Sequence, residues 1–133
     1  MKVHVSLTAR DIGASAAFYR TLLDSEPEKR YEDYALFVTE QPGLELALAL
    51  DPDAKASIGT HYGIAVDAPD LVDRAIERLK NAGIAVDIET EQTCCYALQN
   101  KVWATDPDGR RWEVYHVIAE TEERDGVEMT CCP

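Results

Sequence analysis

Hydrophobic and polar positions alternate along this chain with two different periods, and the two periods occur in the same order twice. Alternation with a period of two residues predicts a strand over Val3–Ala9. A stripe of apolar residues at helical spacing follows, with Asp11 as its expected N-cap. Three short strands are predicted next, over Lys29–Tyr31, Tyr34–Thr39 and Leu44–Leu50. The first half therefore has the order strand, helix and three strands.

The same order restarts at His61. A strand is predicted over His61–Asp67, and Pro69 suits the first turn of the helix after it. Gly83 is expected just past the end of that helix. The remaining strands are predicted over Ile84–Glu89, Leu98–Thr105 and Arg111–Ile118, with Asp106-Pro107-Asp108-Gly109 as a turn between the last two.

The repeat predicts an α+β fold of two βαβββ modules, over residues 1–52 and 58–119. Neither module is large enough to bury both faces of its sheet, so we expect the two to pack together around a shared site. They would form a single domain over residues 1–119. The acidic segment 120–133, which ends in a pair of cysteines, is expected to be a flexible tail.

Composition and charge narrow the class of protein. The chain has 133 residues, 46% of them apolar, which is enough for one domain with a substantial core. A formal net charge of −12 argues against nucleic acid or an anionic membrane as a partner, because both require a basic surface. The first residues lack the apolar region of a signal peptide, and no apolar run is as long as a membrane span. We therefore expect a cytoplasmic protein with reduced thiols.

Two histidines occupy matching positions in the repeat. His4 and His61 stand at the start of the first strand of each module. Because residues two apart in a strand share a face, each histidine is expected on the more polar face of its strand, beside small residues that leave room for a ligand. His116, the third histidine, is predicted to face the other way from Glu113.

Glu113 completes a possible metal site. It lies four residues after Gly109, and the corresponding residue of the first module is Ala47, which has no ligand atom. Two histidines and one carboxylate with open positions are typical of a non-haem Fe(II) site that admits O2 and substrate. The sequence alone also allows Mn(II) or another divalent ion.

Adjacent cysteines are the second chemical feature. The Cα atoms of Cys94 and Cys95 are about 3.8 Å apart, whereas a relaxed disulfide spans about 4.4–6.8 Å. The two thiols are therefore better suited to binding one thiophilic atom together, such as the arsenic of a trivalent arsenical. Since neighbours in a strand point to opposite faces, we expect Thr93–Tyr96 to form a loop. A second pair, Cys131 and Cys132, would either capture arsenicals or belong to a tail without a role.

These motifs resemble those of the vicinal oxygen chelate superfamily, and most closely its arsenic–carbon lyase and cadmium-induced protein branch. The resemblance covers residues 1 to about 118 and rests on His4-Val-Ser-Leu, Phe18-Tyr-Arg-Thr-Leu-Leu, His61-Tyr-Gly-Ile, Thr93-Cys-Cys-Tyr and Asp106-Pro-Asp-Gly-Arg-Arg-Trp-Glu. It implies Fe(II)- and O2-dependent cleavage of the carbon–arsenic bond of trivalent organoarsenicals. It also implies that His4, His61 and Glu113 bind the metal, and that Cys94 and Cys95 bind arsenic.

Three alternatives stay open at this point. The chain could catalyse another metal-dependent reaction of this fold, such as extradiol ring cleavage or thiol transfer, although neither requires a dithiol. It could be a non-enzymatic binder of Cd(II) or As(III), or a plain structural domain. The sequence leaves the oligomeric state open between a monomer and a homodimer.

Overall fold

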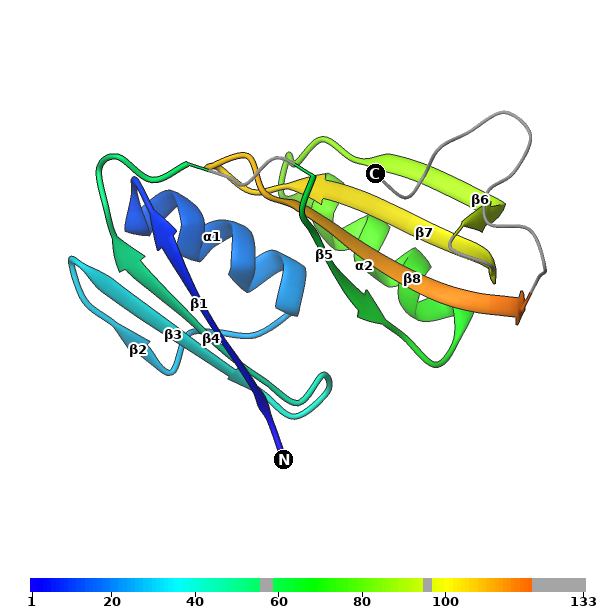
Figure 1. Cartoon of the computed structure of the whole chain (residues 1–133), viewed down its shortest axis with the longest axis horizontal. Coiled ribbons are helices and arrows are strands. Elements are labelled where there is room, and N and C mark those ends of the chain that lie inside the picture. The colour runs from blue at the N-terminus through cyan, green and yellow to red at the C-terminus, as the bar shows by residue number, and fades with distance from the viewer. Residues whose placement is uncertain (56–58, 95–96, 121–133) are drawn as a thin grey trace. The chain divides into compact units, whose positions relative to one another are not determined.

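The computed structural model describes residues 1–55, 59–94 and 97–120, with side chains described outside 91–97. In this part of the chain the elements follow the predicted order twice (Figure 1). They are β1 (Val3–Ala9), α1 (Ile12–Leu23), β2 (Lys29–Arg30), β3 (Tyr34–Thr39), β4 (Leu44–Leu50), β5 (His61–Ala65), α2 (Pro69–Asn81), β6 (Asp87–Cys94), β7 (Ala97–Thr105) and β8 (Arg111–Glu120). The prediction of two βαβββ modules is confirmed.

The chain divides into two compact units, which we describe separately. The first comprises Met1–Ser57 with Asp106–Arg110, and the second comprises Ile58–Thr105 with Arg111–Pro133. Each contains a four-stranded sheet, of order β1-β4-β3-β2 in the first unit and β5-β8-β7-β6 in the second. In both sheets the first strand is an edge strand, parallel to its neighbour, and the other pairs are antiparallel.

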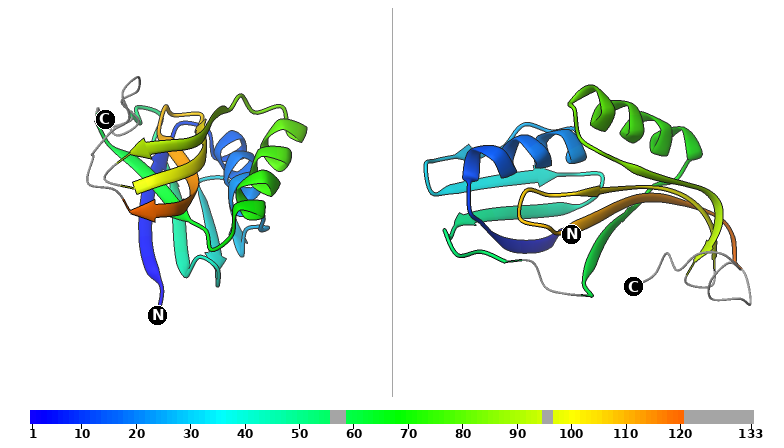
Figure 2. Two further views of the ribbon diagram at one scale, coloured as in Figure 1. Left: turned by 90° about the vertical axis from the view of Figure 1, so that its right-hand side faces the viewer. Right: turned by 90° about the horizontal axis from the view of Figure 1, so that it is seen from above.

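In the first unit, α1 covers one face of the sheet (Figure 2). The helix begins at its predicted cap, where the Asp11 side chain accepts a hydrogen bond from the backbone N–H of Ala14 at 3.0 Å. It buries Tyr19, whose ring packs near that of Phe37 in β3. Phe37 pairs with Leu46 in β4, so both side chains lie on the face of the sheet that α1 covers. The residues next to them in each strand point to the other face, which no described helix of this unit covers.

The second unit repeats this arrangement with α2. Its apolar stripe, Val72, Ala75 and Leu79, is buried, and the helix packs against β7 and β8. Trp112 of β8 stacks on Tyr62 of β5 at 4.9 Å between ring centroids, on the helix side of the sheet. Gly83 follows the helix with a φ of 77°, the left-handed conformation expected of a glycine in this place.

The structure corrects the predicted boundaries of the sixth strand. We expected a strand over Ile84–Glu89 and a loop over Thr93–Tyr96, but β6 starts at Asp87 and runs on through Thr93 to Cys94. Cys95 and Tyr96, the rest of the predicted loop, lie outside the described residues. Thr93 pairs with Leu98 and Cys94 with Ala97. The register shift between Glu89 and Gln92 explains the difference, because an irregular step breaks the simple alternation by which the sequence predicts a strand.

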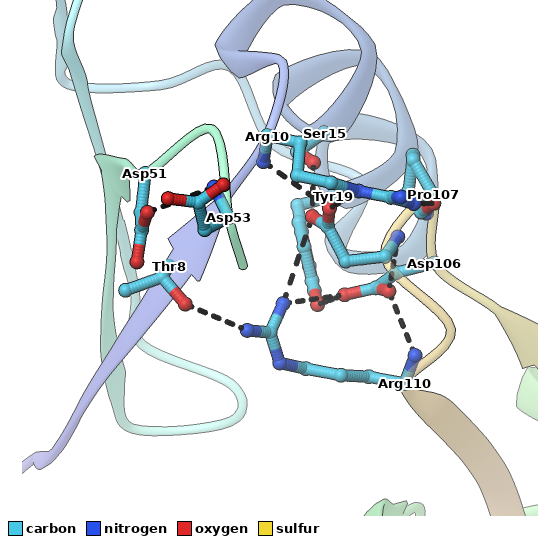
Figure 3. Close-up of polar contacts among 10 residues, drawn as sticks. Thr8, Arg10, Ser15, Tyr19, Asp51, Asp53, Asp106, Pro107 and Arg110 are labelled. Carbon is cyan, nitrogen blue, oxygen red and sulfur yellow. Dashed lines mark hydrogen bonds and ion pairs between the residues drawn. The ribbon is translucent and has the colours of Figure 1, made fainter. Parts of the chain in front are cut away.

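The turn Asp106-Pro107-Asp108-Gly109 groups with the first unit although β7 and β8 belong to the second. Asp106 accepts hydrogen bonds from the Tyr19 hydroxyl at 2.5 Å and from the guanidinium of Arg110 at 3.2 Å (Figure 3). Asp108 accepts from the Arg10 side chain at 2.9 Å, and Arg110 donates to the Thr8 hydroxyl at 3.3 Å. The turn is therefore fastened to α1 and to the end of β1.

Neither helix in the described residues is long and apolar enough to cross a membrane.

Candidate metal centre

His61 and Glu113 lie on the same face of the second sheet, opposite α2. In β5 and β8, His61 pairs with Arg111 and Gly63 pairs with Glu113, so all four share that face. Tyr62 and Trp112, on the alternate positions, stack on the helix side. Glu113 is buried, and His61 packs edge-on against Trp103 of β7 at 5.2 Å between ring centroids. The second unit thus brings together two of the three predicted ligands.

Gly63 allows the Glu113 side chain to lie over strand β5. A Cβ atom at this position would stand 3.1 Å from Cγ and 3.2 Å from Oε1 of Glu113, and 3.0 Å from Cε1 of Tyr115. The sequence suggested that small residues beside the histidine leave room for a ligand. In the structure, the room above Gly63 is instead taken by Glu113 and Tyr115.

Lys101 is a further component of this face. Its side chain is only 1% exposed, and its ammonium donates to Oε2 of Glu113 at 3.4 Å. The ammonium also lies 5.5 Å from the centroid of the Trp103 ring and 5.7 Å from that of Tyr115. A buried lysine requires such compensation, because an isolated ammonium is costly to remove from water.

The surroundings of Glu113 pull its pKa in opposite directions. Burial raises the pKa of the Glu113 carboxyl above its ordinary value, while the charges of Lys101 and His61 lower it and that of Glu89 raises it. Burial also raises the pKa of the Tyr115 hydroxyl, and the charge of Glu113 adds to this effect. The site therefore holds a carboxylate that a cation would stabilise in its charged form.

His4 lies on the open face of the first sheet, on β1. It pairs across the sheet with Glu45 of β4, and its Nδ1 lies 3.2 Å from Oε1 of Glu45. When Nδ1 carries the proton, this contact leaves Nε2 of the ring as an acceptor, the arrangement found behind many metal-binding histidines. Both side chains are about half exposed.

The strand pairings of the two sheets show that Glu113 and Ala47 stand at corresponding positions of the two modules. Glu113 pairs with the residue two places after His61, and Ala47 pairs with Ser6, the residue two places after His4. Glu113 and Ala47 therefore occupy equivalent positions, as the sequence predicted. His116, which is predicted to face the other way from Glu113, has its Nδ1 3.0 Å from the carbonyl oxygen of Val66.

The predicted arsenic-binding thiols are only partly placed. The backbone of Cys94 ends β6, and its side chain lies outside the described ones. Cys95, Cys131 and Cys132 lie outside the described residues, so their predicted roles stay predictions.

The side chains of His61 and Glu113 carry donor atoms of types that bind divalent metals. Within the described residues, no group of three or more His, Cys, Asp or Glu side chains lies close enough together to hold a metal ion. His4 belongs to the first unit, whereas His61 and Glu113 belong to the second. Imidazole nitrogens with one carboxylate oxygen form a donor set suited to Fe(II). Within the second unit, a bound cation would stabilise the charged form of the buried Glu113 carboxyl.

Sequence reasoning missed Glu45 as part of the site. It put Gly63 on the face of His61 only as a small residue that leaves room for a ligand, and it could not place Lys101, whose contact with Glu113 comes from the pairing of β7 with β8. A glycine inside a strand is a signal of close backbone approach, so Gly63 was detectable from sequence. Glu45 becomes visible only when the parallel pairing of β1 with β4 is known.

The fold and these side chains define a class of protein built from two βαβββ modules with potential metal ligands on the open faces of the sheets. The model of the Glyoxalase/Bleomycin resistance protein/Dioxygenase superfamily matches residues 3–114. This chain belongs to that superfamily.

Two groups of curated relatives are similar over nearly the whole chain. Cadmium-induced protein CadI of Mycobacterium tuberculosis is 37% identical, covering 98% of this chain and 92% of that protein. Trivalent organoarsenical cleaving enzymes of Bacillus sp. (strain MD1) and Thermomonospora curvata are 38% and 35% identical. These matches cover 97% and 98% of this chain, and 81% and 87% of the two enzymes.

Solved structures support the fold. A glyoxalase/bleomycin resistance protein/dioxygenase from Alicyclobacillus acidocaldarius superposes with a TM-score of 0.72 at 22% identity, covering 89% of this chain and 92% of that one. The fosfomycin resistance protein FosX of Listeria monocytogenes gives a TM-score of 0.67 at 17% identity, covering 87% and 92%.

Proposed function

We propose that this protein cleaves the carbon–arsenic bond of trivalent organoarsenicals in a reaction that uses Fe(II) and O2. One observation above all supports it: in the sheet registers, His4 and His61 take equivalent places on the open faces, and Glu113 has a ligand atom where Ala47 has none. The relatives named trivalent organoarsenical cleaving enzymes support the choice of reaction. His4, His61 and Glu113 would hold the metal, which when bound would supply the activation of O2.

The adjacent thiols would bind the substrate. Cys94 and Cys95, as thiolates, would displace the two hydroxyls of a species such as methylarsonous acid and leave its organic group as the third substituent on arsenic. Holding arsenic in this way fixes the orientation of the bond to be cleaved. Aromatic trivalent arsenicals would be substrates of the same kind.

The overall reaction balances without another reductant. Methylarsonous acid and O2 together contain the atoms of one arsenite and one formaldehyde. The carbon–arsenic bond breaks, one oxygen atom goes to arsenic and the other to carbon, and O2 accepts the electrons that the methyl group loses.

The test is anaerobic reconstitution of the full chain with Fe(II), followed by methylarsonous acid and air. Inorganic arsenite and formaldehyde are then quantified. We expect both products in equal amounts, and only when Fe(II) and O2 are both present. Tight binding of the arsenical without arsenite formation would contradict the proposal.

A Cys95→Ser variant is expected to lose turnover while it keeps its metal. The hydroxyl of serine does not form the thiolate bond that holds arsenic, and Cys95 is not in the proposed ligand set. Turnover and bound iron are measured on the same sample. Cys132→Ser is the matched control for removal of one thiol, and its turnover is compared with that of Cys95→Ser at saturating substrate. Its turnover at low substrate concentration tests separately whether the tail pair captures arsenicals. Near wild-type turnover in Cys95→Ser would refute the assignment of the substrate-binding thiols.

A second candidate function rests on the relatives named cadmium-induced protein, which match as closely. In that case the thiol pairs would sequester Cd(II) or As(III), and the protein would not be an enzyme. Stoichiometric binding of Cd(II) by the thiols, unaffected by loss of His61 or Glu113, together with no arsenite formation, would favour this function.

A further inference from the structure

The Glu113 carboxylate is held from two sides by residues that are not in the proposed ligand set. In the sheet, β8 lies between β5 and β7, and Glu113 pairs with Gly63 on one side and with Trp103 on the other. Lys101 is two residues from Trp103 along β7 and reaches Oε2 of Glu113 at 3.4 Å. Oε1 points to the other side, over Gly63, where a Cβ would stand only 3.2 Å away.

These contacts give the two carboxylate oxygens different roles. A carboxylate binds a metal through one oxygen or through both, and a bidentate mode takes up a coordination position. The ammonium of Lys101 is a hydrogen-bond donor with a full positive charge, so the oxygen that it engages is a poor partner for a second cation. Oε1 is then the oxygen left for a metal, and Gly63 provides the space in which it lies.

We infer that Lys101 and Gly63 are positioning residues which restrict Glu113 to binding a metal through Oε1 alone. This inference rests on the proposed function, because the proposed reaction supplies the reason for restricting Glu113 to one oxygen. A reaction that joins O2 and a substrate at one metal needs open coordination positions, and a monodentate Glu113 leaves one more of them free. Lys101 would in this way preserve the open side of the site without touching the substrate.

Glu89 lies beside Lys101 in the same sheet. It is the cross-strand partner of Lys101 in β6, and its charge acts on Glu113. Its Oε2 is buried and, among the described residues, has no hydrogen-bond partner. The sheet therefore places a second carboxylate-bearing residue directly across from Lys101.

The first test uses Co(II), which binds the same donor types and gives an absorption spectrum without turnover. Gly63→Ala is expected to weaken Co(II) binding about tenfold or more, because the new methyl group displaces Glu113 by some tenths of an ångström. Gly13→Ala is the matched control. Its Cβ would meet no described atom closer than 3.4 Å, so Co(II) binding should be unchanged.

The second test counts open positions on the Co(II)-loaded protein with azide. Lys101→Met should weaken azide binding about tenfold or more, because Glu113 becomes free to bind through both oxygens. Lys101→Arg retains a charged donor and should keep azide binding closer to that of the wild type. Loss of packing alone would lower the melting temperature of both variants without a selective effect on azide.

The outcomes separate this inference from the function on which it rests. If the wild type does not bind Co(II) or Fe(II), the proposed metal site is wrong and the inference is wrong with it. If the wild type binds the metal but Gly63→Ala and Lys101→Met match it in both titrations, the positioning roles are wrong and the proposed function stands.

Discussion

A Glu113→Gln variant is expected to bind Fe(II) at least about 100-fold more weakly than the wild type and to lose turnover. Mutation of a residue that only orients a metal ligand typically lowers metal affinity roughly 10–100-fold, so loss of the one carboxylate in the proposed ligand set should lower it further. The substitution keeps the size of the side chain and one oxygen atom but removes the negative charge. Metal affinity is measured by anaerobic titration and turnover by arsenite formation.

The same substitution should also destabilise the protein, because it leaves the Lys101 ammonium without its closest carboxylate. Lys101 is 1% exposed, and removing one partner of a buried ion pair costs up to about 3–5 kcal/mol. The double variant Lys101→Met/Glu113→Gln removes both charges and is expected to recover most of the unfolding free energy. It should not recover metal binding. Recovery of metal binding in the double variant would contradict the role of Glu113 as a ligand.

The second large effect is expected at Asp106, whose Asn variant should lose about 3–5 kcal/mol of unfolding free energy. The Asp106 side chain is fully buried and accepts four hydrogen bonds (Figure 3). These come from the Tyr19 hydroxyl, the Arg110 guanidinium and the backbone N–H groups of Asp108 and Arg110. An amide has one oxygen to accept them, and its NH2 group would face other donors. Arg110, 7% exposed, would also lose its nearest countercharge.

Urea unfolding followed by circular dichroism measures this change. Glu26→Gln is the matched control in the same unit. Its partner Arg20 lies 4.0 Å away at an exposed surface, so the change in stability should stay below about 1 kcal/mol. Tyr19→Phe should fall between the two, at about 1.5–3 kcal/mol, because it removes one hydrogen bond to a charged acceptor and keeps the ring. Equal stability of Asp106→Asn and Glu26→Gln would show that the turn does not fasten the first unit.

The strands and helices of this chain were mostly predictable because their signals are local. Asp11 caps α1 through its own side chain, and Gly83 takes the left-handed conformation that its place after α2 requires. The prediction was wrong at β6, where a register shift after Glu89 displaced the strand to Asp87–Cys94. An irregular pairing is decided by the neighbouring strand, so the alternation of β6 by itself does not contain it.

The sequence by itself determined the repeat, the order of the elements and the faces on which His61 and Glu113 lie, because these follow from periods of 2 and 3.6 residues. Only the tertiary structure decided what surrounds them. Lys101 meets Glu113 through the pairing of β7 with β8, and Asp106 meets Tyr19 across 87 residues of sequence. Such contacts depend on which strands become neighbours and in which register. That choice is made by the packing of the whole unit, and no local pattern of residues encodes it.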